Sequence, residues 1–129
     1  RESEIENLIR SKGAVYAGIS SLLDALDLNA DGIQNVYIAG AFGNRLRVED
    51  AVTIGMLPDI PRERIKFAGN TSLAGAYLGL MCHQAREEIV KIAHNMTYME
   101  LSVMPSFMDE FVAAMFLPHT DLSRFPSQS

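Results

Sequence analysis

The chain has 129 residues and a mass of 14.2 kDa, which is enough for one domain with a single buried core. Hydrophobic residues make up 48% of it and charged residues 21%, and this composition excludes an intrinsically disordered chain. The net charge of -5, with its basic residues scattered, argues against nucleic-acid binding. No apolar run approaches the ~18 residues of a membrane span, so no membrane partner is expected.

The cysteine content and the start of the chain bear on its location and extent. The single cysteine, Cys82, can neither form an internal disulfide nor hold an iron–sulfur cluster or a structural zinc by itself. Its apolar surroundings predict a buried, unreactive thiol. Without a signal peptide, the glycosylation sequons at Asn70 and Asn95 are interpreted as chance matches in a cytoplasmic protein. The opening "RESEIENLIRSKG" lacks a methionine and starts in helical pattern, which predicts a piece of a longer protein.

Apolar periodicity predicts a long helix at the start, from a capping box at Ser3 to near Leu28. Gly13 and Gly18 lie inside it, and each requires a close neighbour to offset its low helix propensity. The remaining expected elements are a strand at 36–39, a helix at 48–57, a strand at 64–69, a helix at 72–95 capped by Thr71, a strand at 97–102, a helix at 105–116 and a loose tail at 121–129. The predicted apolar stripe of the helix at 72–95 consists of Leu73, Tyr77, Leu80, Met81, Ile89 and Ile92.

This alternation predicts an α/β fold with parallel strands covered by helices on both faces. Three strands make a thin sheet for so many helices. Further strands are therefore expected upstream or from another chain.

Two candidate metal sites do not hold up. "DLNADG" resembles the start of a calcium-binding EF-hand loop, but Ile38 stands where the closing glutamate should be, which favours a helix-ending turn. The three histidines, His83, His94 and His119, lack metal-ligand spacing. No metal ligand is therefore predicted, and we find no catalytic residue either.

The stretch "NVYIAGAFGN" is the main candidate for a ligand site. A glycine turn between a strand and a helix suits a nucleotide, because glycine lets the backbone approach a ligand. It is neither a G-x-G-x-x-G nor a Walker motif, so a purely structural turn stays open. "FAGNTSLAGA" repeats the plan, and there close helix–sheet packing is the better interpretation. Lys12 falls in phase with the apolar stripe of the first helix, where it either snorkels to solvent or faces a ligand together with the glycine turn.

Five segments together resemble the C-terminal region of the reductive activators of corrinoid proteins: "IRSKGAVYAGISSLL", "VYIAGAFGN", "AVTIGMLPDIPRERI", "FAGNTSLAGAYLGL" and "YMELSVMPSFMDEFVAAMFLPHT". They occur in order from Ile5 to Thr120. The resemblance implies an RNase-H-like subdomain of the actin, chaperone and sugar kinase (ASKHA) superfamily, at residues 1–120. It also implies a parent protein that uses ATP and Mg²⁺, carries a 2Fe–2S cluster in a separate N-terminal domain, and returns Co(II) corrinoid to Co(I) for methyltransferases.

By this resemblance the glycine turn is the adenosine motif, with matching residues Gly40, Ala41, Phe42, Gly43 and Asn44, and the helix that carries Lys12 flanks the adenine. Ala41 replaces the second glycine of the usual pair and narrows the space for a nucleotide. The family's phosphate loops and its acidic Mg²⁺ residue find no match here, so this part alone is expected neither to be catalytic nor to bind a cofactor independently.

Two hypotheses follow. In the first, the chain is the adenosine side of an ATP site in a reductive activator whose partners are a corrinoid protein and a methyltransferase. In the second, it is a non-catalytic interaction module, in which the methionine-bearing C-terminal segment or an exposed sheet edge docks a partner or forms a homodimer. A free-standing dinucleotide-binding domain lacks the required acidic residue about twenty positions after the turn.

Overall fold

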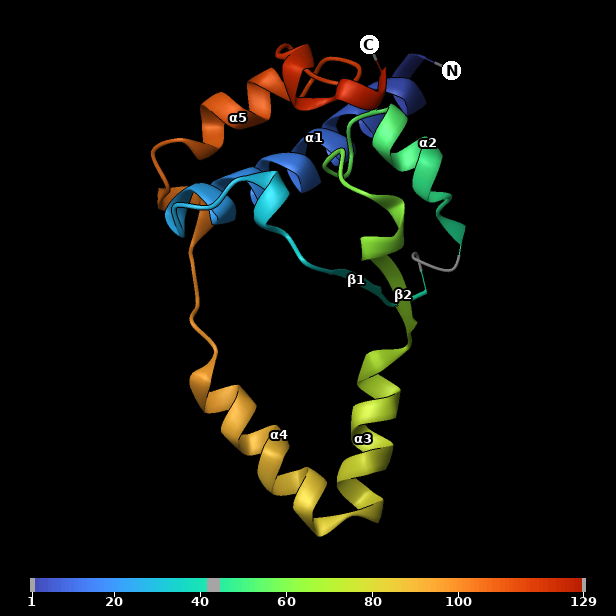
Figure 1. The fold of residues 1–129 in the computed structure, drawn as a ribbon, viewed down its shortest axis with the longest axis vertical. Helices are drawn as coiled ribbons and strands as arrows, with labels where there is room; N and C mark the ends of the chain where they lie inside the picture. The colour runs from blue at the N-terminus through green and yellow to red at the C-terminus, as the bar shows by residue number, and fades with distance from the viewer. Residues whose placement is uncertain (1, 42–44, 129) are drawn as a thin grey trace.

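A computed structural model describes residues 2–41 and 45–128 of the chain (Figure 1). Helix α1 (Glu2–Ala25) lies beside α5 (Phe107–Ala113), and α2 (Val48–Thr53) lies at the other side of the same body. Strands β1 (Val36–Ala39) and β2 (Ile65–Gly69) form the sheet, and α3 (Thr71–Met81) and α4 (His83–Asn95) extend away from the body. The short remaining pieces are 3-10 turns at Ala30–Gly32, Arg62–Arg64, Leu101–Val103, Leu122–Arg124 and Pro126–Gln128.

Helix α1 has the close neighbours that its glycines predicted. A Cβ at Gly13 would lie 3.4 Å from the carbonyl oxygen of Ala114, so α5 approaches the α1 backbone there. The helix ends three residues before the predicted Leu28, in a Schellman turn: Leu28 N–H donates to Leu23 O at 2.9 Å, and Asp27 takes a left-handed conformation with φ 55°. The "DLNADG" stretch is therefore a helix-ending turn.

The two strands run parallel, with Val36 opposite Ile65 and Ile38 opposite Phe67. Side chains of β1 alternate between half-buried and exposed, which makes one face of the described sheet the core side. The predicted third strand at 97–102 is wrong, because the chain there is irregular and enters the 3-10 turn Leu101–Val103. In the described residues the sheet therefore has two strands, with helices beside them.

The buried core lies between α1, the α2 region and the end of the chain. Val52 and Phe125 are fully buried there, although they are 73 positions apart in the chain. The buried hydrophobic cluster consists of Tyr16, Ala51, Val52, Met56, Leu57, Ile60, Ile65, Ala114 and Phe125.

The helix predicted at 72–95 is broken in two. Cys82 is extended, with φ -135° and ψ 120°, and it separates α3 from α4. The two helices pack on each other, through contacts such as Gly79 with Ile89, and neither has a buried residue. No described helix is long and apolar enough to cross a membrane.

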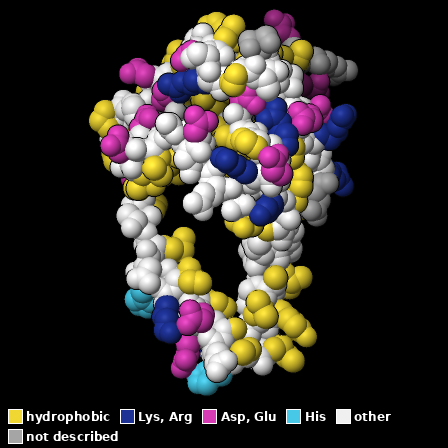
Figure 2. Space-filling model, viewed as in Figure 1, with side chains coloured by type: hydrophobic (Ala, Val, Ile, Leu, Met, Phe, Trp, Pro, Cys, Tyr) yellow, Lys and Arg dark blue, Asp and Glu magenta, His cyan; other side chains and the backbone are white. Residues whose placement is uncertain are grey.

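The predicted apolar stripe does not lie in the core of the described chain. All six of its residues are exposed, Leu80 to 78%. Figure 2 shows these hydrophobic side chains along the projecting pair of helices, which we call the arm (71–95). Cys82 is exposed as well, contrary to the buried thiol that its neighbours predicted.

The tail, expected to be loose, is packed onto the body at residues 121–128. Phe125 is 0% exposed, and its ring centroid lies 5.5 Å from that of Tyr16. Arg124 donates to both carboxylate oxygens of Glu110 on α5, and Ser127 N–H donates to Asp59 at 2.7 Å. The tail packs because one buried aromatic ring and these polar contacts stabilise it more than its polar composition favours a solvated segment.

His119 is buried at the base of this tail. Its Nδ1 accepts the N–H of Asp121 at 2.9 Å, so the ring proton sits on Nε2, which has no partner among the described residues. Burial lowers the pKa of His119, the Lys12 and Arg124 charges act in the same direction, and Glu110 and Asp121 oppose it. The ring is therefore held neutral, and protonation would remove the acceptor for Asp121.

This arrangement predicts a loss of stability in mild acid. The folded-state pKa of His119 lies below 6.5, so its contribution is complete above pH 6.5 and is lost as the pH falls through the folded-state value. The free energy of unfolding, measured in urea between pH 7.5 and 4.5, should fall more steeply in wild type than in His119→Phe, which keeps an aromatic ring there. Parallel pH profiles would contradict a buried neutral His119.

Candidate functional site

The two glycine turns lie side by side at the carboxyl edge of the sheet. Gly40 follows β1 and Gly69 ends β2, and Gly40 N–H donates to Gly69 O at 2.7 Å. Both residues have left-handed backbones, with φ 89° and 65°, and apart from its chain neighbours neither has an atom of the described residues within 4 Å of where a Cβ would be. Among the described residues, the edge therefore leaves open space beside the half-buried backbone of both glycines, as a ligand that approaches the main chain requires.

The candidate turn is described only in part. Ala41 is exposed and directly follows Gly40. Phe42, Gly43 and Asn44, the other members of the expected adenosine motif, lie outside the described residues. Their assignment stays a prediction from the sequence.

Helix α3 begins beside this edge. Asn70, and not the predicted Thr71, is its N-cap: Asn70 Oδ1 accepts the N–H of Leu73 at 3.0 Å. The small residues of α3 do not pack on the sheet as the sequence suggested, since a Cβ at Gly75 would meet nothing within 4 Å. The sequence analysis did not predict that the two glycine turns contact each other. The strand–glycine–helix pattern that occurs twice in the chain was the signal that could have indicated it.

Lys12 is fully buried, so snorkelling to solvent is wrong. Its ammonium donates to the carbonyl oxygens of Phe116 and Pro118, the second at 2.8 Å. Both acceptors belong to the segment between α5 and the tail. Burial lowers the pKa of Lys12 from 10.5 to about 8.

The buried ammonium predicts that stability rises with pH in mild alkali. Between about pH 8 and pH 10.5 the unfolded chain holds the Lys12 proton and the folded chain releases it, so the folded state gains up to about 3 kcal/mol. Lys12→Met should lack this rise and should be less stable at pH 7, because two carbonyls lose their donor. Urea midpoints from pH 7 to 10.5 measure both effects; an equal rise in Lys12→Met would refute the assignment.

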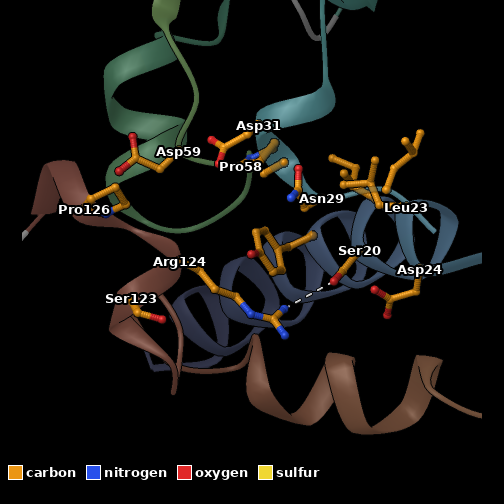
Figure 3. A pocket seen from close by; sticks show the side chains of 14 residues that line it. Ser20, Leu23, Asp24, Asn29, Asp31, Pro58, Asp59, Ser123, Arg124 and Pro126 are labelled. Carbon is orange, nitrogen blue, oxygen red and sulfur yellow. Dashed lines mark hydrogen bonds between the residues drawn. The ribbon is translucent and has the colours of Figure 1, made fainter. Parts of the chain in front are cut away.

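A pocket of about 380 Å³ takes part of its lining from the segments that lead into β1 and β2, so it lies at the opposite edge of the sheet from the glycine turns. Figure 3 shows the side chains that line it. Its walls come from α1, from 28–31 ahead of β1, from 58–59 ahead of β2, and from the tail at 123–126. Three aspartates line it against one arginine, Arg124, which is already bonded to Glu110 and Ser20. The pocket is therefore ill suited to the phosphates of a nucleotide, and the glycine edge remains the candidate for one.

The described residues form no cluster of side chains that could bind a metal ion. No group of three His, Cys, Asp or Glu residues could hold an ion there. Asn29, one of the calcium-like positions, instead accepts the N–H of Gly32 with its side chain at 3.1 Å. His83 and Glu87 are both exposed and 4.0 Å apart.

Comparisons with known proteins give consistent matches. Residues 1–129 match a family model described as the C-terminal domain of RACo, the ASKHA domain. A solved structure of a reductive activator for a corrinoid, iron–sulfur protein is 50% identical, with a TM-score of 0.92 over 98% of this chain and 20% of that one.

Two curated relatives are more distant. The corrinoid activation enzyme RamQ of Eubacterium limosum is 28% identical over 86% of this chain and 19% of its own length. The Co(II) methylated amine-specific corrinoid protein reductase of Methanosarcina barkeri is 27% identical over 74% of this chain and 18% of its own. The chain thus spans about a fifth of the length of the relatives it matches. These matches confirm the predicted α/β, RNase-H-like fold class.

Proposed function

Because this chain belongs to the family of C-terminal ASKHA domains of RACo, we propose that it is part of an ATP-dependent reductive activator of corrinoid proteins. The observation that carries the proposal is the match over residues 1–129, together with 50% identity to a solved reductive activator. The proposed reaction adds one electron to Co(II) corrinoid and gives Co(I), for use by a methyltransferase in the cytoplasm.

Within this activity we propose that the carboxyl edge of the sheet binds the adenosine of ATP. The adjacent Gly40 and Gly69 turns support this, because their open backbone lets a flat base and a ribose approach closely. Ala41, Phe42, Gly43 and Asn44 complete the proposed contact by sequence. The ammonium of Lys12 is bonded elsewhere, so we propose that α1 flanks the nucleotide and that Lys12 acts by holding α1 in place.

The electron carrier must be held by other residues. A 2Fe–2S cluster takes four protein ligands, usually cysteines, and this chain has one cysteine, which is exposed on the arm. Likewise, the described residues hold no carboxylate cluster for Mg²⁺. The proposed contribution of the chain is therefore binding and orientation of the nucleotide, and not phosphoryl or redox chemistry.

The test uses the complete gene product. Gly40→Val forces a β-branched residue into φ 89° and should weaken ATP binding at least tenfold in calorimetry, with a matching loss of ATP-dependent reduction. Reduction is followed by the absorbance change from Co(II) to Co(I) corrinoid protein, with titanium(III) citrate as the electron donor.

Two variants serve as controls. Gly75→Ala adds a methyl group in open space on α3 and should change neither quantity, and Ala41→Gly should keep or raise the affinity. Unchanged ATP affinity in Gly40→Val would remove the adenosine assignment. Reduction that needs no ATP would remove the proposed coupling while leaving the site intact.

The exposed arm favours a second candidate, a surface for self-association. Leu80 is 78% exposed and Met81 69%, and α3 carries no charged residue, so two copies could pack without repulsion. If the arm forms a homodimer, Leu80→Lys should halve the mass of the complete gene product in light scattering. Leu26→Lys, at a 57% exposed site on the body, is the matched control; an unchanged mass in Leu80→Lys contradicts this interface.

A further inference from the structure

We propose that the pocket at the amino edge of the sheet is a second binding site, which takes an alkylammonium or alkylguanidinium group. It lies at the far end of the strands from the proposed adenosine contact. The inference is therefore independent of the proposed function.

The apolar part of the pocket is built by the end of α1. The Schellman turn brings the N–H of Leu28 to the carbonyl oxygen of Leu23. Both residues line the pocket with Ile19, Pro58 and Pro126, and Figure 3 labels Leu23 and the two prolines. The wall ahead of β1 is held in place, because Arg64 donates to the carbonyl oxygens of Asp31 and Ile33 at 3.2 and 2.9 Å. Such a preformed apolar wall suits the carbon stem of a ligand.

The charges around this wall select a cation. Asp24 and Asp31 line the pocket, and neither carboxylate forms a hydrogen bond or ion pair with another described residue. Asp59 also lines it but is paired with Arg62 at 2.8 Å. These two aspartates, Asp24 and Asp31, are exposed, and their carboxylates have no partner in the described chain.

The guanidinium of Arg124, which also lines the pocket, does not neutralise the carboxylates of Asp24 and Asp31. Arg124 donates to Glu110 at 2.8 and 3.2 Å, lies 3.5 Å from Asp121 and also contacts Ser20. The hydrogen bond with Glu110 raises the pKa of Arg124, so this charge is fixed and already matched.

The helix end acts in the same direction. The last turn of α1 carries no basic residue and does carry Asp24, at the end where the helix dipole is negative. The Asp24 carboxylate and the negative end of the α1 dipole would both attract a cation in the pocket. The combination of an apolar wall, two unpartnered carboxylates and a helix C-terminus fits a positive group on a short carbon stem, as in an arginine or lysine side chain or a small free amine.

The experiment is a titration of the complete gene product with n-butylguanidinium, followed by methyl NMR. The Leu23 and Leu28 methyl signals should shift and Leu80, on the arm, should not. The neutral isostere n-butylurea and the anion pentanoate should bind at least tenfold more weakly. Raising the salt from 50 to 500 mM should weaken binding of n-butylguanidinium only.

Variants then test the two carboxylates. Asp24→Asn and Asp31→Asn should each weaken binding by about fivefold, and Glu87→Gln, an equal change of charge on the arm, should not. Equal binding of n-butylurea, or unchanged affinity in both aspartate variants, would overturn the proposal. A peptide, acetyl-Gly-Arg-Gly-amide, identifies the source: binding at least as tight as n-butylguanidinium indicates a protein side chain, and its exclusion indicates a small free cation.

Discussion

The fold depends on the contacts that hold the segment from Phe116 to Pro118 in place from two sides. On one side the Lys12 ammonium bonds the carbonyl oxygens of Phe116 and Pro118. On the other, Gly55 has φ 74°, and a Cβ there would lie 2.1 Å from the Pro118 oxygen, so no side chain fits. A charge buried without a carboxylate is costly, and it is tolerated here because it satisfies two carbonyls that would otherwise be left without a donor.

These contacts of Lys12 and Gly55 determine the path of the tail. With Pro118 fixed, His119 lies against Tyr16, and Phe125 closes the core between α1 and the α2 region. Arg124 then reaches Glu110 on α5 and Ser20 on α1, and it becomes one wall of the pocket. The amino-edge pocket thus exists because the tail is packed, and the tail is packed because Lys12 and Gly55 hold its base.

Local signals predicted the parts of the fold that depend on neighbours in the chain. The strand at 36–39 has its predicted bounds, and the requirement of Gly13 for a close neighbour is met by α5. The failures involve long-range contacts. Lys12 finds acceptors more than a hundred positions away, and Phe125 is buried by α1, so neither pattern nor composition could predict them. The break at Cys82 and the missing strand at 97–102 had no glycine or proline to mark them.

The two edges of the sheet differ in what they can bind, and the cause is the chain direction. Parallel strands bring both glycine turns to the carboxyl edge, where backbone is exposed and the amino end of α3 begins. The amino edge instead receives the end of α1, the aspartate-bearing connectors and the tail. Helix dipoles therefore favour negative groups at the first edge and positive groups at the second. A nucleotide and a cation would thus occupy opposite ends of the same two strands, so that β1 and β2 connect the two sites directly.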